Sequence, residues 1–118
     1  MSSNSKLILS QHTHLGDSSV ETVVGEKAQG DGFYGRSDGV HTVQYAITAF
    51  VGTVMLEATL ATDPAEQDWF TVYEEEFPLI NNTATTTSKI TNFTGNYVWV
   101  RASVVYSGGT VNSILLNH

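Results

Sequence analysis

Apolar and polar residues alternate along much of this chain with a period of two, the spacing of a β-strand that buries one face. The alternation is clearest at residues 54–60, where every second residue is Val, Leu, Ala and Leu. It is equally clear at residues 98–106, where the series is Val, Val, Ala, Val and Tyr. Both series predict inner faces of core strands. No segment carries a sustained 3.6-residue apolar period, so no long helix is expected.

Eight segments have this strand character, and turn residues separate them. They are residues 6–10, 20–24, 41–48, 53–62, 69–74, 85–92, 97–105 and 110–116. Eight short strands predict an all-β protein built as an antiparallel, jelly-roll-like β-sandwich. Within this fold, residues 1–24 are expected to form an N-terminal arm or edge strands, and residues 25–118 a single β-sandwich domain.

Two local signals predict the connections between strands. Ser107, Gly108 and Gly109 indicate a tight hairpin between the last two strands, which would then pair antiparallel. One helical turn is expected at residues 63–68, with Asp63 as its cap and Pro64 in its first turn.

The second face of residues 97–105 is also largely apolar, because it carries Tyr97, Trp99 and Val105. The opposite face already supplies the core, so these three residues predict an interface with a second copy or another protein. The N-terminal arm is the alternative cover. Arg101 lies between them and is expected to be structural, stacking or pairing across strands.

Composition narrows the classes of function. The 118 residues suit one domain, the formal net charge is −7, and five lysines and arginines are scattered singly. Nucleic-acid binding needs clustered cations, and an acidic surface is repelled by anionic membranes, so neither partner is expected. No cysteine is present, and the early apolar run at residues 7–9 is too short for a signal peptide or a span. These features predict a soluble intracellular product.

The string GDGFYG at residues 30–35 matches the G-x-G-x-x-G pattern of dinucleotide-binding loops. That pattern binds a pyrophosphate only where a helix begins after it. A strand signature at residues 41–48 follows instead, so the glycines are interpreted as a loop and no cofactor is expected.

Candidate metal and catalytic groups are sparse. His12 and His14 could supply two metal ligands from one strand face, but a pair of surface histidines is the favoured interpretation. Glu74 and Glu76 could converge on a hard cation such as Ca²⁺, although a solvated strand end fits better. Asp31 and Asp38 are a further, weaker Ca²⁺ candidate. No G-x-S-x-G elbow and no paired carboxylates are recognisable, so the chain is predicted not to be an enzyme.

Aromatic side chains provide the main binding alternative, because their faces stack on sugar rings. The candidates are Phe33, Tyr34, Trp69, Tyr73, Tyr97 and Trp99. Core packing or a subunit contact is the favoured role for them. A row of aromatics beside Asp, Asn and Arg in an exposed groove would instead indicate a carbohydrate-binding module.

Two stretches, GTVMLEATLATDPAEQDWFTV at residues 52–72 and FTGNYVWVRASVVYSGGTVNSILLNH at residues 93–118, resemble small structural proteins and fibre modules of tailed bacteriophages. The resemblance is strongest to virion proteins of T4-like myoviruses of marine cyanobacteria, and GDGFYGRSDGVHTVQY extends it to residues 25–118. It implies a non-enzymatic virion protein for capsid decoration, neck, baseplate or tail fibre. Its partners would be itself, as a homotrimer, and other virion proteins. The alternative is a carbohydrate- or receptor-binding module of a phage fibre that contacts host-surface carbohydrate.

Overall fold

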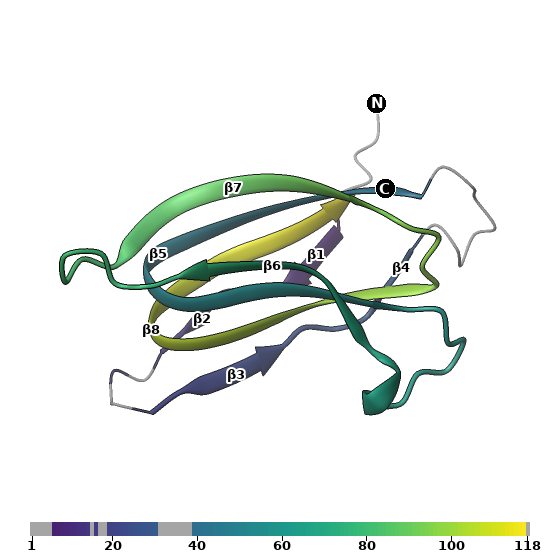
Figure 1. Ribbon diagram of the computed structural model, residues 1–118, viewed down its shortest axis with the longest axis horizontal. Helices are drawn as coiled ribbons and strands as arrows, with labels where there is room; N and C mark the ends of the chain where they lie inside the picture. The colour runs from purple at the N-terminus through teal and green to yellow at the C-terminus, as the bar shows by residue number, and fades with distance from the viewer. Residues whose placement is uncertain (1–5, 15, 17–18, 31–38, 118) are drawn as a thin grey trace.

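The computed structural model describes residues 6–14, 16, 19–30 and 39–117. It confirms the all-β class, since the described residues form eight strands that are joined in one antiparallel sheet, together with one short 3₁₀ helix (Figure 1). The elements are β1 Lys6–Leu9, β2 His12–Thr13, β3 Glu21–Val24, β4 Ala28–Gln29, β5 Val40–Thr59, η1 Glu66–Asp68, β6 Phe70–Phe77, β7 Thr85–Thr94 and β8 Trp99–Asn117.

Two long bent strands, β5 and β8, form the frame of the molecule. They pair antiparallel from one end to the other, and both curve at the same end of the molecule (Figure 1). The pairing register shifts between Thr48 and Gly52, where the curve lies. The ribbon of two strands is thereby folded onto itself, and each strand contributes to both layers of a sandwich.

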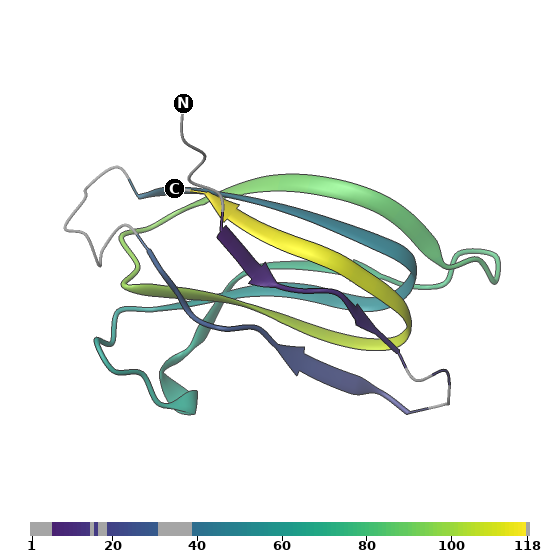
Figure 2. The same cartoon turned by 180° about the vertical axis from the view of Figure 1, so that it is seen from behind.

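The shorter strands extend the two layers on either side. The first layer contains β7, the first half of β5, the second half of β8, β1 and β2. The second layer contains β6, the second half of β5, the first half of β8, β3 and β4. Figure 2, seen from behind, shows β1 and β3 along the side of the molecule next to β8. One side of the sandwich is therefore edged by β1, β2, β3 and β4 and the other by β6 and β7.

The hairpin expected at residues 107–109 is wrong. Residues 99–117 form one strand, and its two halves pair with different halves of β5 rather than with each other. Gly109 nevertheless has a positive φ of 90°, and it lies against Ala49 of β5, whose φ is also positive, at 49°. The glycines thus allow a strand to cross from one layer to the other, instead of reversing the chain direction.

The core lies between the layers and follows the predicted alternation. Val54, Leu56 and Ala58 are buried on β5, and every second residue from Val100 to Tyr106 is buried on β8. The two series depart from prediction at their ends: Leu60 is 70% exposed and Val98 is only partly buried. Strand β5 ends at Thr59, so Leu60 lies beyond the layer that would have covered it.

The N-terminal segment is part of this core. Ile8 and Leu9 of β1 are buried in it, and β3 pairs with residues 103–106 of β8. Gly25 lies so close to the carbonyl of Ile8 that any Cβ there would overlap it. Strands β1 and β3 therefore approach each other along the open side of the sandwich.

The helical turn expected at residues 63–68 is shorter than predicted. Helix η1 spans Glu66–Asp68 and begins after Ala65 rather than after Asp63. The Asp68 carboxylate accepts a hydrogen bond from the Ala65 amide at 2.8 Å. This bond fixes the short connection between β5 and β6.

Two buried tyrosines make the fold sensitive to alkaline pH. Burial raises the pKa of Tyr45, and its 2.9 Å hydrogen bond with Tyr73 raises it further; burial also raises the pKa of Tyr106. A folded-state pKa above the unfolded value of 10.0 means that full stability is present below pH 10 and is lost as the pH rises above it. We expect the free energy of unfolding to fall above pH 10, measured by urea denaturation, and less steeply in Tyr45→Phe. Complete phenolate absorbance with an unchanged circular dichroism spectrum would contradict this.

Candidate functional site

A cleft of about 420 Å³ opens at the end of the sandwich where β5 and β6 meet. Its walls come from four places in the chain: the end of β5 and the residues after it, helix η1, the start of β6, and Tyr97 shortly before β8. The lining residues are Ala58, Thr59, Leu60, Ala61, Asp68, Phe70, Val72 and Tyr97. The cleft exists because β5 ends at Thr59 while its partner β6 begins directly opposite, at Phe70.

Two large apolar side chains at this cleft are exposed to solvent. Leu60 is 70% exposed and Phe70 is 68% exposed. Phe70 pairs with Ala58 of β5, whose side chain is buried, so the Phe70 ring is directed to the inner side of its layer at the open end. Exposed apolar side chains gathered in a hollow are typical of a binding surface.

Tyr97 forms the deeper aromatic part of the cleft. Its ring is partly buried against the core and lies 6.1 Å from the rings of both His41 and Phe93. His41 in turn stacks on Phe93, with ring centroids 4.9 Å apart, and its Nδ1 is 2.9 Å from the carbonyl oxygen of Gly39. This aromatic cluster fixes the position of Tyr97 from behind.

Polar groups stand beside these apolar walls. Asp68 brings a carboxylate, whose Oδ2 is held by the Ala65 amide. The hydroxyl of Thr59 accepts a hydrogen bond from the Ala61 amide at 3.1 Å, which orients it at the end of β5. The cleft therefore combines the exposed ring of Phe70, the packed ring of Tyr97 and a hydrogen-bonded carboxylate in one place.

The sequence did not single out Leu60, Asp68 or Phe70 as binding residues. The strand alternation continues through Leu60 and predicts it in the core. Phe70 follows Trp69, and nothing in the local pattern marks which of these neighbouring aromatics is exposed. Only the ends of β5 and β6 decide this.

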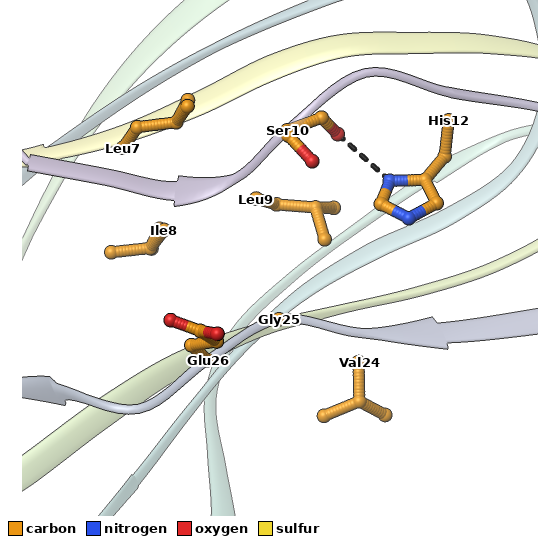
Figure 3. A pocket seen from close by; sticks show the side chains of 8 residues that line it. All are labelled: Leu7, Ile8, Leu9, Ser10, His12, Val24, Gly25 and Glu26. Atoms are coloured by element: carbon orange, nitrogen blue, oxygen red, sulfur yellow. Dashed lines mark hydrogen bonds between the residues drawn. The ribbon is translucent and has the colours of Figure 1, made fainter.

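A second hollow, of about 320 Å³, lies on the opposite side between β1 and the segment from β3 to β4 (Figure 3). Leu7, Leu9 and Val24 contribute aliphatic side chains, and the His12 Nδ1–H donates to the Ser10 carbonyl at 2.8 Å. No aromatic side chain apart from the His12 imidazole lines it, so it offers no stacking surface comparable to Phe70.

The predicted interface residues Tyr97, Trp99 and Val105 do not share one face. Strand β8 begins at Trp99, and Tyr97 precedes it and packs toward the core, so the strand alternation does not reach Tyr97. Trp99 and Val105 lie on the outer face of the second layer and are partly buried. The Nε1–H of Trp99 donates to the Thr62 carbonyl at 2.9 Å, and Lys27 lies 4.5 Å from the ring. That a partner covers Trp99 and Val105 stays a prediction.

Arg101 has the structural role that the sequence predicted. Its side chain stacks over Trp69 at 4.3 Å and donates to Glu57 at 2.8 Å and to Glu66 at 3.1 Å. It thereby joins β8 to its neighbour β5 and to helix η1. The ion pair also lowers the pKa of the Glu66 carboxyl, through the hydrogen bond from Arg101 first and its charge second.

The remaining aromatic candidates do not form a row. Trp69 is stacked under the Arg101 guanidinium, Tyr73 shares a hydrogen bond with Tyr45, and Tyr97 lies in the cleft. Phe33 and Tyr34 lie outside the described residues. Trp69 and Tyr73 thus make the packing contacts that the sequence favoured, and the described candidates do not form the exposed row that would indicate a sugar platform. Phe70, which was not a candidate, lines the cleft together with Tyr97.

The two histidine candidates point to different partners. The Nδ1 of His14 accepts from the Gly16 amide at 2.9 Å, and its Nε2 is 2.8 Å from the Ser19 carbonyl and 3.3 Å from Glu21. His12 instead bonds to Ser10. His14 is buried rather than on the surface.

The acidic run is part of β6. Glu75 pairs with Lys89 at 2.7 Å, while Glu74 and Glu76 are exposed on the outer side of the strand. Across residues 6–30 and 39–117, apart from the few left undescribed, no three His, Asp or Glu residues gather as a metal site would require.

The glycine-rich string leads into a strand. Residues 31–38 lie outside the described residues, and β5 begins at Val40. The Asp31 and Asp38 candidates cannot be placed for the same reason. Helix η1, the single helix in the described part of the chain, has three residues and could not span a membrane.

Comparison with known proteins gives fold relatives alone. No protein-family model matches the sequence, and no curated protein matches it. Among solved structures, the K2 cleaved adhesin domain of Lys-gingipain matches with a TM-score of 0.50 and 12% identity. The match covers 82% of this chain and 62% of the adhesin domain. This chain thus spans less than two thirds of that domain.

Two carbohydrate-binding modules match more completely but less well in shape. A family 29 module from Piromyces equi has a TM-score of 0.47 and 8% identity over 97% of this chain and 90% of the module. A module of Cellvibrio mixtus lichenase 5A, solved with cellotriose, has a TM-score of 0.41 and 13% identity over 94% and 98%. At these identities, the likeness to the adhesin domain shows a shared β-sandwich fold.

Proposed function

We propose that this chain is a non-catalytic binding module and that its ligand is a carbohydrate held in the cleft at Phe70 and Tyr97. The observation that carries the proposal is the 68% exposed ring of Phe70 beside Tyr97 and the Asp68 carboxylate. A sugar ring has one face of C–H groups and a rim of hydroxyls. The first packs on an aromatic ring, and the second donates to a carboxylate.

The shape of the cleft agrees with a short oligosaccharide rather than a buried small molecule. Its volume of about 420 Å³ lies at the lower end of ligand pockets, and Leu60 and Phe70 leave its mouth open to solvent. A short oligosaccharide can therefore reach the cleft from solvent. Among the residues that the structure describes, a single carboxylate lines it, which suits binding, whereas glycoside hydrolysis commonly uses two.

We expect Phe70→Ala to weaken glycan binding by about tenfold, which corresponds to about 1.4 kcal/mol of lost stacking. A glycan array that carries cello- and malto-oligosaccharides first identifies a ligand. Isothermal titration calorimetry then measures the affinity of the wild type and the variant for that oligosaccharide in solution. Asp68→Asn should weaken binding as well, because the amide presents one acceptor oxygen in place of two.

Leu79→Ser provides the matched control, since Leu79 is 54% exposed but lies on the turn between β6 and β7, outside the cleft. It should bind as the wild type does. Failure of every oligosaccharide on the array to bind, or wild-type affinity in Phe70→Ala, would refute the assignment.

A structural protein of a phage virion is the second candidate, and it rests on a different observation. Exposed aliphatic side chains occur on several separate surfaces rather than on one, as a subunit with several neighbours requires. They include Val20, Val24, Leu79, Ile80 and Ile90. The sequence resemblance to phage proteins favours the same function, with the chain assembled in the virion as a homotrimer. Mass spectrometry of purified particles tests it directly, and both functions would hold if this is the glycan-binding part of a fibre.

A further inference from the structure

The outer face of the first layer is built from uncharged residues. Three cross-strand rows run over it, as the pairing of β1, β8, β5 and β7 places them. The middle row is Leu7, Leu115, Gln44 and Ile90; the flanking rows are Asn117, Thr42 and Asn92, and Ser113, Ala46 and Ser88. We refer to these ten residues as the neutral face.

The outer face of the second layer is charged, in contrast. Glu57 and Arg101 lie at its centre, and Glu74 and Glu76 lie on its edge strand β6. The chain as a whole has a net charge of −7. Two copies that met through the second layer would bring carboxylates together, while two copies that met through the neutral face would not.

The neutral face also has a shape that suits a copy of itself. Ile90 is 67% exposed, and a hollow of about 290 Å³ lies beside it. Thr42, Gln44 and Leu115 line this hollow together with Ile90. A two-fold axis places the same patch on both partners, so the Ile90 side chain of each copy can enter the hollow of the other.

The strand edge beside this face favours the same arrangement. Strand β7 is ten residues long and lies at the edge of its layer, with Lys89 as its charged residue. Lys89 points inward, where it pairs with Glu75 of β6. Its charge is therefore turned away from the neutral face, and a second copy can pack there without burying it.

We propose that the neutral face is a self-association surface, on which a second copy of this chain docks sheet on sheet around Ile90 and Leu115. The occupant is a copy because the face lacks the charges by which a basic or acidic partner would be selected. The exposed Ile90 side chain also lies directly beside the hollow that a second Ile90 side chain can enter. This surface differs from the one predicted from Trp99 and Val105, and it is independent of the cleft at Phe70.

Sedimentation velocity of the full chain, without added sugar, tests the proposal. We expect the wild type to dimerise with a dissociation constant below about 100 µM, seen as a sedimentation coefficient that rises with protein concentration. Ile90→Glu should raise the dissociation constant by at least about tenfold, because each copy would insert a carboxylate into the other's uncharged hollow, beside the carboxylate of the other copy. Ile80→Glu is the matched control: Ile80 is 62% exposed but lies outside the neutral face, and this variant should dimerise as the wild type does.

Two further measurements keep the test decisive. Circular dichroism must show the wild-type spectrum for Ile90→Glu, which is expected because the side chain is exposed. An equimolar mixture of Ile90→Glu and Ile90→Lys should recover association that neither variant shows alone. A wild type that remains monomeric at about 100 µM, or an Ile90→Glu variant that dimerises normally, would overturn the proposal.

Discussion

Replacing Gly109 with alanine is expected to lower the free energy of unfolding by about 3 kcal/mol, the largest single effect that we predict. Gly109 has φ of 90°, which an alanine adopts only with strain. The added Cβ would also overlap the carbonyl of Ala49 in the neighbouring strand. Because those atoms belong to the backbone, relief would require separating β5 and β8 where both strands curve. Urea denaturation followed by circular dichroism measures the effect.

Gly108→Ala is the matched control for this prediction. It introduces the same methyl group one residue earlier, where no atom lies within 4 Å and φ is not positive. We expect it to change the free energy of unfolding by less than about 1 kcal/mol, in the stabilising direction, because alanine reduces the freedom of the unfolded chain. Equal effects of the two substitutions would show that the curve does not depend on Gly109.

Replacing Arg101 with methionine is expected to lower the free energy of unfolding by about 2 kcal/mol, or the melting temperature by roughly 8 °C. The methionine keeps most of the side-chain volume over Trp69 but loses the bonds to Glu57 and Glu66. Glu57 is the source of the cost, since its side chain is only 19% exposed and would keep its charge without its partner. Calorimetric melting of the variant measures the loss.

Lys89→Met tests whether any ion pair would have the same effect. The Lys89 and Glu75 side chains are 43% and 36% exposed, so water screens the pair and its loss should leave the melting temperature nearly unchanged. A double variant, Arg101→Met with Glu57→Gln, should recover part of the loss, because it removes the unpaired charge. An unchanged melting temperature for Arg101→Met would mean that stacking on Trp69, rather than charge pairing, holds the β5–η1 connection.

The all-β class, most of the inner faces and the role of Arg101 could be derived from the sequence, whereas the two long strands β5 and β8 were each predicted as two short ones. Each of the derived features depends on neighbours along one strand: Val54 and Leu56 share a face because side chains alternate, whichever strand lies beside them. Arg101 was recognisable in the same way, since a guanidinium between Trp99 and Ser103 in a strand needs stacking or acidic partners. The identity of those partners, Glu57 and Glu66, was not, because they are 44 and 35 residues away.

The hairpin at Ser107–Gly108–Gly109 shows where local reasoning ends. A serine and two glycines allow a reversal or a bend equally well, and the choice depends on which partner each half of the strand finds. Strand β5 is long enough to pair with both halves of β8, so the strand bends instead of reversing. Nothing within residues 107–109 encodes the length of β5.

The sequence by itself determined that this chain is an all-β domain with an acidic, weakly charged surface. Strand alternation can be read from consecutive residues, and net charge is a sum over the chain, so neither depends on which strands pair. Only the tertiary structure decided which apolar residues remain in water. Leu60 and Phe70 are exposed because β5 ends and β6 begins at that point, and Ile90 is exposed because its pairing with Gln44 places it on the outer face of its layer. Tyr97 leaves the face of Trp99 because β8 begins two residues after it. Exposure depends on where layers end, and layer ends are set by partners distant in the chain.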